Sequence, residues 1–475
     1  MAKAAPVTPR IAAAAGVMFL FLACSDRQPS GLTPAAPSVG VQRAPAFSLE
    51  STDPTSLDQH LVLVNDSIPA DFDIQVASLG GAVVAMYPEI GLAVTAGLSD
   101  TAASQLAQVS FVSGIARDQM VQWVPGPEDF HLEAVEAAEP GVQTNQSGAF
   151  FFNFWQWNIR QIDANDAWLT TNQGAGTRVA ILDTGTDPGH LDLIGKVDLA
   201  ASRSFVVGSP CGPADDADIL DRHFHGTFVS AIVTSRGIGM ASVAPDARII
   251  AVKVLSCSGG GSFAALIGGI VYAADIGADV INMSLGAYFP KNVPGGGALV
   301  AALNRATTYA TEHGAVLVAA AGNDTADVQH DQNFVFLPAQ AAHVISVGAT
   351  SPTHQANFDD LAPYTNFGIS GVNLMAPGGN PVVDARDGIL SACSRFSRVF
   401  RSCAPGISYL VGGSGTSFAA PHVAGAAAVV KSQFPGYGPD QIRRCLYKGA
   451  DDLGRPGTDQ LYSHGRLNVL GAAGC

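Results

Sequence analysis

From residue 155 onward, short apolar stretches alternate with longer ones, and this alternation restricts the fold more than any other feature. The short stretches have the length of buried strands and the longer ones that of buried helices, which predicts an α/β domain with a doubly wound, mainly parallel sheet. We expect strands at 179–182, 249–255, 280–285, 315–320 and 344–347, with helices at 225–234, 263–276 and 299–313. In such a sheet the ligand lies beyond the carboxyl ends of the strands.

Candidate functional residues stand at three of these strand ends. Asp183 closes the first strand before a glycine turn, the stretch 284–286 closes the third, and Asn323 follows the fourth. Because the carboxyl ends of parallel strands meet at one edge, we expect these residues at a common rim.

Two predicted helices begin with residues typical of nucleophilic catalysis. Ser417 follows a glycine-rich stretch and precedes an Ala, Val and Gly run, so it is expected at the start of a buried helix, where the helix dipole favours an anion. His225 begins a second apolar helix. Serine needs an imidazole to take its proton, and the imidazole needs a carboxylate, for which Asp183 is the candidate. A lone Gly-Thr-Ser would be better explained as a glycine-rich turn leading into a packed helix.

Four segments resemble the active-site motifs of the subtilisin-like serine peptidases, in the same order along the chain. They are Ile181-Leu-Asp-Thr-Gly185, His225-Gly-Thr227, Ala320-Ala-Gly-Asn323 and Gly415-Thr-Ser-Phe-Ala-Ala-Pro-His422. The resemblance covers residues 150–475, and the proteinase K-type secreted enzymes are the expected branch. It implies that Asp183, His225 and Ser417 form a catalytic triad and that Asn323 contributes to an oxyanion hole.

The same resemblance places a substrate groove. It implies that Gly260 and Leu285 flank the subsites before the cleaved bond, with Ser284 offering its backbone to an extended peptide. It assigns the pocket for the residue immediately before that bond to Gly286, Ala320, Ala321 and Gly322. These small walls predict a roomy pocket for large apolar side chains. The alternative for each glycine is a simple turn.

Residues 1–24 are predicted to be an export signal. Lys3 and Arg10 form a basic start, and the apolar stretch 11–23 is too short to span a bilayer comfortably. The ending Phe-Leu-Ala-Cys24 resembles a bacterial lipobox, although Phe21 is atypical of one, so Cys24 is a lipidation candidate and ordinary cleavage nearby is the alternative. The expected location is therefore secreted or in the cell envelope as a lipoprotein. Residues 25–56 form a flexible tether.

Residues 57–124 predict a small α+β domain with the order βαββαβ. Beside a subtilisin-like domain this order resembles the family's inhibitory prosegment, and a separate accessory domain is the alternative. Residues 125–149 are rich in acidic residues, Pro, Gly, Gln and Asn, and are predicted to be the processing linker.

The cysteines indicate disulfides rather than a metal site. Besides Cys24 there are six, an even number in an exported chain, and none stand at the two-residue spacing of zinc clusters. Among the fifteen pairings that six cysteines allow, we favour sequence neighbours. These are Cys211 with Cys257, Cys393 with Cys403, and Cys445 with Cys475.

Acidic residues raise the question of calcium, an ion common in the family. The candidates are Asp187, Asp192, Asp215, Asp216, Asp218 and Asp221. The run 215–221 lacks an EF-hand pattern, so a solvated loop is favoured over structural calcium, and the chemistry itself requires no cofactor. A net charge of -15 and the lack of a Lys/Arg cluster argue against nucleic acid as a partner.

Together these features predict an exported serine endopeptidase that forms an acyl-enzyme on extended proteins and is made as an autoprocessed zymogen. Two other classes were weighed. An inactive scaffold used as a surface binding module would lack a triad or oxyanion residue. An α/β-hydrolase lipase would show Gly-X-Ser-X-Gly and the chain order Ser, Asp, His, neither of which occurs around Ser417.

Overall fold

A computed structural model describes residues 56–125, 133–135, 146–292, 295–403, 406 and 408–475. The expected export signal with Cys24, nearly all of the tether, and the linker stretches 126–132 and 136–145 lie outside the described residues.

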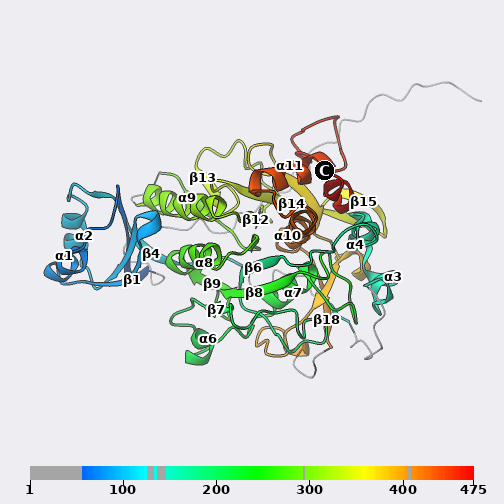
Figure 1. Ribbon diagram of the computed structural model, residues 1–475, viewed down its shortest axis with the longest axis horizontal. Helices are drawn as coiled ribbons and strands as arrows, with labels where there is room; N and C mark the ends of the chain where they lie inside the picture. The colour runs from blue at the N-terminus through cyan, green and yellow to red at the C-terminus, as the bar shows by residue number, and fades with distance from the viewer. Residues whose placement is uncertain (1–55, 126–132, 136–145, 293–294, 404–405, 407) are drawn as a thin grey trace, which may run out of the picture. The chain divides into compact units, whose positions relative to one another are not determined.

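The large domain is built on a mainly parallel sheet with the strand order β15-β14-β12-β10-β6-β8-β7, as the alternating pattern predicts (Figure 1). The central strands are β6 (Arg178–Asp183), β8 (Arg248–Lys253), β10 (Val280–Met283), β12 (Val316–Ala320) and β14 (Val344–Thr353). The edges are β7 (Arg203–Ser204), β16 (Leu374–Pro377), which pairs with β14, and the antiparallel β15 (Ala356–Leu361). The central strands are almost wholly buried because helices cover both faces.

Four helices cover this sheet. They are α7 (His225–Val233), α8 (Phe263–Asp275), α9 (Gly296–Glu312) and α10 (Thr416–Gln433). The connection from β6 to β8 crosses the sheet in the opposite direction to those from β8 to β10 and β12, so right-handed crossovers place α7 on one face and α8 with α9 on the other. α10 packs against α7 and the central strands, and nearly all of its residues are buried.

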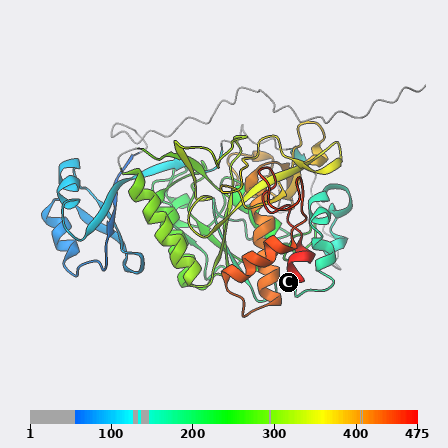
Figure 2. The same ribbon diagram turned by 90° about the horizontal axis from the view of Figure 1, so that it is seen from above.

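The N-terminal unit has the predicted βαββαβ order (Figure 2). Its elements are β1 (Ser56–Val64), α1 (Phe72–Ser78), β2 (Ala82–Tyr87), β3 (Leu92–Ala96), α2 (Asp100–Leu106) and β4 (Val112–Gln122). The sheet is antiparallel, and a separate small core around Val62, Phe72 and Leu106 lies between it and the helices. β4 also pairs with β9 (Gly260–Ser262), so the sheet continues into the large domain.

Two further small sheets were not anticipated from the sequence. β11 (Ala287–Pro290) pairs with β13 (Phe334–Leu337), and β17 (Ile389–Ala392) pairs with β18 (Leu410–Gly413). The linker contributes β5 (Glu133–Val135), which pairs with the other side of β18. All these pairings are antiparallel.

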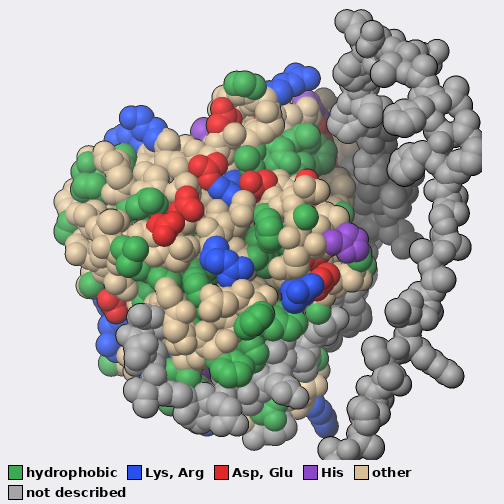
Figure 3. Space-filling view, turned by 90° about the vertical axis from the view of Figure 1, so that its right-hand side faces the viewer, with side chains coloured by type: hydrophobic (Ala, Val, Ile, Leu, Met, Phe, Trp, Pro, Cys, Tyr) green, Lys and Arg blue, Asp and Glu red, His purple; other side chains and the backbone are tan. Residues whose placement is uncertain are grey.

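The six cysteines of the large domain form three disulfides between sequence neighbours: Cys211–Cys257, Cys393–Cys403 and Cys445–Cys475. On the face shown in Figure 3, basic and acidic side chains are interspersed rather than gathered by sign. A search of the described ranges finds no helix with the length and hydrophobicity needed to cross a membrane.

Candidate active site

Asp183 and His225 form a buried pair at the rim of the sheet. Asp183 ends β6, and its carboxylate oxygens lie 2.9 and 3.0 Å from Nδ1 of His225, the first residue of α7. Both side chains are fully buried. The turn after Asp183 touches the helix start directly, because a Cβ on Gly226 would overlap the carbonyl oxygen of Gly185. With Nδ1 donating to the carboxylate, Nε2 is the basic nitrogen of the neutral ring.

The buried carboxylate of Asp221 holds the backbone that leads to His225. It accepts hydrogen bonds of 2.9–3.0 Å from the N–H groups of His223 and Phe224, and bonds of 2.7–2.8 Å from the N–H and hydroxyl of Thr227. It also accepts a bond of 2.9 Å from the hydroxyl of Thr184, the residue after Asp183. Phe224 has φ 142°, a conformation that a non-glycine residue adopts only under constraint. Asp221 therefore ties the Asp183 turn to the start of α7.

Ser417 is the second residue of α10, as expected for a serine at a helix start. The next residue, Phe418, packs its ring 5.6 Å from the His225 ring and stacks on Phe228 of α7 at 3.9 Å. These contacts bring the Ser417 end of α10 to the His225 end of α7.

The amide of Asn323 is oriented by Thr416, the residue before Ser417. Its Oδ1 accepts hydrogen bonds from the Thr416 N–H at 2.9 Å and the Thr416 hydroxyl at 2.8 Å. The Thr416 hydroxyl accepts in turn from the N–H of Gly322 at 3.1 Å. With Oδ1 used in this way, the Nδ2 group is left as the donor that faces the start of α10, and a Cβ on Gly415 would lie 3.6 Å from it.

The end of β4 occupies the groove that the sequence assigned to substrate. Met120–Gln122 pairs antiparallel with Gly260–Ser262, and the N–H of Gly286 donates to the carbonyl of Trp123 at 2.9 Å. The Trp123 indole is almost wholly buried against Phe263 and Phe289, with ring centroids 5.2 and 5.6 Å away, and its N–H donates to the Gly261 carbonyl. Trp123 stands in none of the sequence motifs, although a large aromatic side chain with one polar N–H is a natural anchor for a strand.

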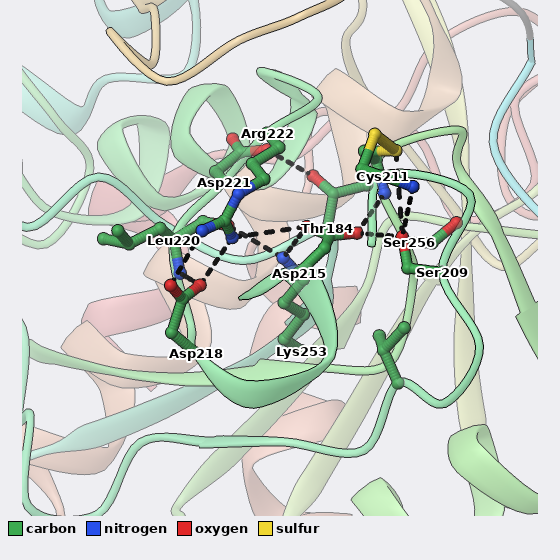
Figure 4. A network of polar contacts seen from close by, with 12 residues as sticks. Thr184, Ser209, Cys211, Asp215, Asp218, Leu220, Asp221, Arg222, Lys253 and Ser256 are labelled. Atoms are coloured by element: carbon green, nitrogen blue, oxygen red, sulfur yellow. Dashed lines mark hydrogen bonds and ion pairs between the residues drawn. A yellow bond between two sulfur atoms is a disulfide. The ribbon is translucent and has the colours of Figure 1, made fainter. Parts of the chain in front are cut away.

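The acidic run 215–221 is not the solvated loop that we expected, because Asp215 and Asp221 are fully buried (Figure 4). Asp215 Oδ1 lies 2.6 Å from the ammonium of Lys253, the last residue of β8, and neither side chain is exposed. Asp215 also accepts from the hydroxyl of Ser209 and from the N–H of Cys257. Burial alone would raise the pKa of Asp215, but the bonds from Lys253 and Ser209 outweigh it and hold this pKa below its ordinary value.

Arg222 extends this network to Asp218, to which its guanidinium donates at 2.6 and 2.8 Å. Lys253 also donates to the carbonyl of Leu220 at 2.8 Å. The network thus joins the end of β8, the loop before α7 and, through Cys257, the turn before β9. A single lysine at the end of an apolar strand was the sequence signal for this buried pair, and it was not used.

The other calcium candidates are also engaged by protein groups. Asp187 accepts from the N–H of Gly189 and pairs with Arg395 at 3.4 Å, and Asp192 accepts from Ser235, Ile238 and Gly239. Among the residues that the structure describes, no group of three or more His, Cys, Asp or Glu side chains is arranged to hold a metal ion.

His422 is a second histidine near Ser417 but lies inside α10. Its Nδ1 donates to the Phe418 carbonyl, and its Nε2 accepts from the Asn158 amide, both at 2.8 Å. Burial lowers the pKa of His422 to about 4, so the ring is neutral near pH 7. Its place and its bonds fit a structural role.

Comparisons with known proteins agree with this geometry. The model of the subtilase family matches residues 174–465. A thermophilic serine proteinase of Bacillus sp. (strain AK1) is 33% identical over 344 residues, 71% of this chain and 72% of the relative. Subtilisin Savinase of Lederbergia lenta is 33% identical over 318 residues, 66% of this chain and 97% of the relative. Among solved structures, the epidermin leader peptide processing serine protease of Staphylococcus aureus matches with a TM-score of 0.69 and 25% identity, covering 87% of this chain and 97% of that one.

We predict that Lys253→Met destabilises the fold by about 3–5 kcal/mol, because it leaves the buried Asp215 carboxylate with only the longer ion pair to Arg222, at 3.4 Å. Adding Asp215→Asn should recover part of the loss by removing that charge. Urea unfolding in a Ser417→Ala background measures both changes without self-digestion. The pKa of Asp215 is depressed, so its stabilisation is present near neutral pH and is lost as the pH falls below about 4. An unchanged unfolding midpoint for Lys253→Met would contradict this role.

Proposed function

Because the chain belongs to the subtilase family of serine peptidases, we propose that it is an exported endopeptidase that cleaves extended proteins through an acyl-enzyme. In this proposal Asp183, His225 and Ser417 are the triad, and Asn323 supplies the oxyanion-hole amide. The observation that carries the proposal is the buried pair of Asp183 and His225, whose Nδ1 is bonded to both carboxylate oxygens. An imidazole held in this tautomer at the nucleophile end of α10 is what serine catalysis requires.

The proposed reaction has two halves, formation and hydrolysis of the acyl-enzyme, and the same side chains act in both. Nε2 of His225 accepts the Ser417 proton as Oγ attacks the peptide carbonyl, and the resulting imidazolium is stabilised by Asp183. The oxyanion meets the Asn323 amide and the Ser417 N–H at the start of α10, where the helix dipole adds to the stabilisation. The imidazolium then protonates the leaving amine. Water attacks the ester while giving a proton to Nε2, and the imidazolium passes this proton to Oγ of Ser417 as the acid product leaves.

The contacts of β4 support the proposed mode of substrate binding. An extended substrate is proposed to take the place of residues 120–124, adding a strand to β9 through Gly260 and accepting a hydrogen bond from Gly286, while Ser284 and Leu285 line its path. Because that place is filled in the full chain, residues 57–124 are proposed to be an inhibitory prosegment.

The pairings on either side of Ser417 suggest where the precursor is cut. Residues 120–122 pair with β9, and residues 133–135 pair with β18, which ends four residues before Ser417. We propose that a chain held at both places presents a bond to the nucleophile in between. We therefore propose that self-cleavage falls between Val124 and Glu133, within the 125–149 linker.

Export is proposed from the sequence of residues 1–24. The mass of the N-terminal peptide of the exported precursor, before the prosegment is cut off, distinguishes the two routes, since lipidation at Cys24 adds acyl chains and ordinary secretion does not.

We predict that Ser417→Ala accumulates as an uncut precursor that lacks peptidase activity, because the attacking oxygen is missing. Wild-type chain should lose residues 57–124 at a rate independent of its concentration, since the bond is held beside the nucleophile. Gel analysis and N-terminal sequencing follow both. Added active enzyme should trim the Ser417→Ala chain in the linker. Maturation of purified Ser417→Ala at the wild-type rate, without other proteases, would reject both the nucleophile and self-processing.

We predict that Asn323→Ala lowers kcat by about 10² to 10³ with little change in KM, the range known for such an amide in subtilisin. The reason is that the amide meets negative charge only after attack. Asn323→Asp is the matched variant, because it keeps the acceptor for Thr416 but has no N–H to donate, and it should lose at least as much activity. A change mainly in KM would exclude the oxyanion role.

Arg305 of α9 contacts the N-terminal unit outside the groove. Its guanidinium donates to the carbonyls of Val64, Ile90 and Gly91 at 2.7, 3.2 and 3.2 Å, and to the Ser113 hydroxyl at 3.3 Å. A planar fork suits a cluster of carbonyls better than a single ammonium does. We propose that Arg305 is a second anchor of the prosegment.

We predict that Arg305→Ala releases the cleaved prosegment at least about ten-fold faster, the effect of losing about 1.4 kcal/mol of charged hydrogen bonding. The rate is followed as recovery of peptidase activity after dilution of freshly processed protein. Arg305→Lys should fall between the two, and the final activity of all three should be equal. Equal release rates for Arg305→Ala and wild type would contradict the anchor.

A further inference from the structure

In the proposed peptidase, one substrate side chain enters between the segments that follow β10 and β12, a place that we call the crevice. The two strands are parallel neighbours, so the segments that follow them, 284–286 and 321–323, leave the sheet side by side. Gly286 binds the extended chain in the groove through its N–H, and Asn323 lies beside the start of α10. Consider a peptide that binds Gly286 and places its reactive carbonyl at Asn323. The substrate residue that carries this carbonyl then directs its side chain between the two segments.

An aromatic ring already lies in this crevice. A Cβ built on Gly286 would lie 2.7 Å from Cζ of Phe336, and a Cβ built on Gly322 would lie 2.8 and 2.9 Å from Cζ and Cε2 of the same ring. The tip of one phenyl ring thus touches both backbones. Phe336 is only 5% exposed.

The ring of Phe336 is held in place from behind. β13 pairs with β11 so that Phe336 is opposite Tyr288, and the two rings meet edge to face at 4.9 Å. The hydroxyl of Tyr288 accepts from the buried amide of Asn366 at 2.9 Å, and the same amide donates to the Ala321 carbonyl at 2.8 Å. Phe336 packs against Tyr288, and Asn366 links Tyr288 to the Ala321 carbonyl in the wall of the crevice. A rotation of Phe336 out of the crevice would therefore disturb Tyr288 and, through Asn366, the wall.

We propose that Phe336 fills the deep end of the pocket for the residue immediately before the cleaved bond, so that this peptidase cuts after small side chains such as Ala, Gly and Ser. This inference rests on the proposed peptidase function. It replaces the roomy pocket expected from the small wall residues Gly286, Ala320, Ala321 and Gly322. Two of those residues, Gly286 and Gly322, lie against the Phe336 ring, which comes from β13, a strand not expected from the sequence.

The test compares peptide p-nitroanilides that differ only in the residue before the scissile bond, Ala or Phe, on processed enzyme. We expect kcat/KM of the wild type to be at least about ten-fold higher for Ala, because the Phe substrate must displace a packed ring. Phe336→Gly should reverse this preference, and Phe336→Ala is the second variant if glycine weakens β13. Val335→Ala, the neighbouring position of the same strand, is the matched control and should keep the wild-type ratio.

Cleavage of unfolded casein, read by mass spectrometry, gives a second measure of the same preference. Wild-type enzyme that cuts after Phe as readily as after Ala would overturn the proposal, and so would Phe336→Gly or Phe336→Ala with an unchanged ratio. Failure of the peptidase function itself is distinct, since no substrate of the series would then be hydrolysed by any variant.

Discussion

The parallel pairing of β6, β10 and β12 is the constraint from which the site follows. Parallel strands end at the same edge, so the residues that follow them meet there although they are far apart in the chain. Asp183, Gly286 and Asn323 come from three such ends. A shift in the register of these buried strands would expose apolar side chains, so the register is fixed and this edge of the sheet is rigid. The relative positions of Asp183, Gly286 and Asn323 therefore depend on the sheet rather than on the loops.

Buried carboxylates fix the position of His225, as the sheet fixes the position of Asp183. His225 begins a helix and is preceded by the constrained Phe224, so its position depends on the loop before it. Asp221 supplies acceptors for the N–H groups of that loop, and Asp215 with Lys253 fastens the same loop to β8. Each carboxylate is matched by donors, which avoids the cost of a buried unpaired charge. The ammonium of Lys253 is thus the cation beside Asp215, a carboxylate for which the sequence alone had left calcium as an alternative.

The N-terminal unit packs closely against the large domain at positions where the large domain has glycines. Gly268 of α8 lies against the Tyr87 hydroxyl, and Gly295 before α9 lies against Ala116 of β4. The carbonyl contacts of Arg305 add a charged anchor at a distance from the strand pairing with β9. The N-terminal unit thus makes two separate contacts with the large domain, the strand pairing with β9 and the hydrogen bonds from Arg305.

The sequence by itself determined the fold class, the βαββαβ order of the N-terminal unit and the identity of the candidate triad, because strand and helix periods and the residues at strand ends are local properties. It failed where the outcome depends on distant pairing. The burial of Asp215 is decided by Lys253, which is 38 residues away, and nothing in the spacing of the acidic run indicates it. The Phe336 ring lies against Gly286 and Gly322 because β13 pairs with β11, across a stretch where no sheet was expected from the sequence. Such contacts join residues that are distant along the chain, so only the tertiary structure decided them.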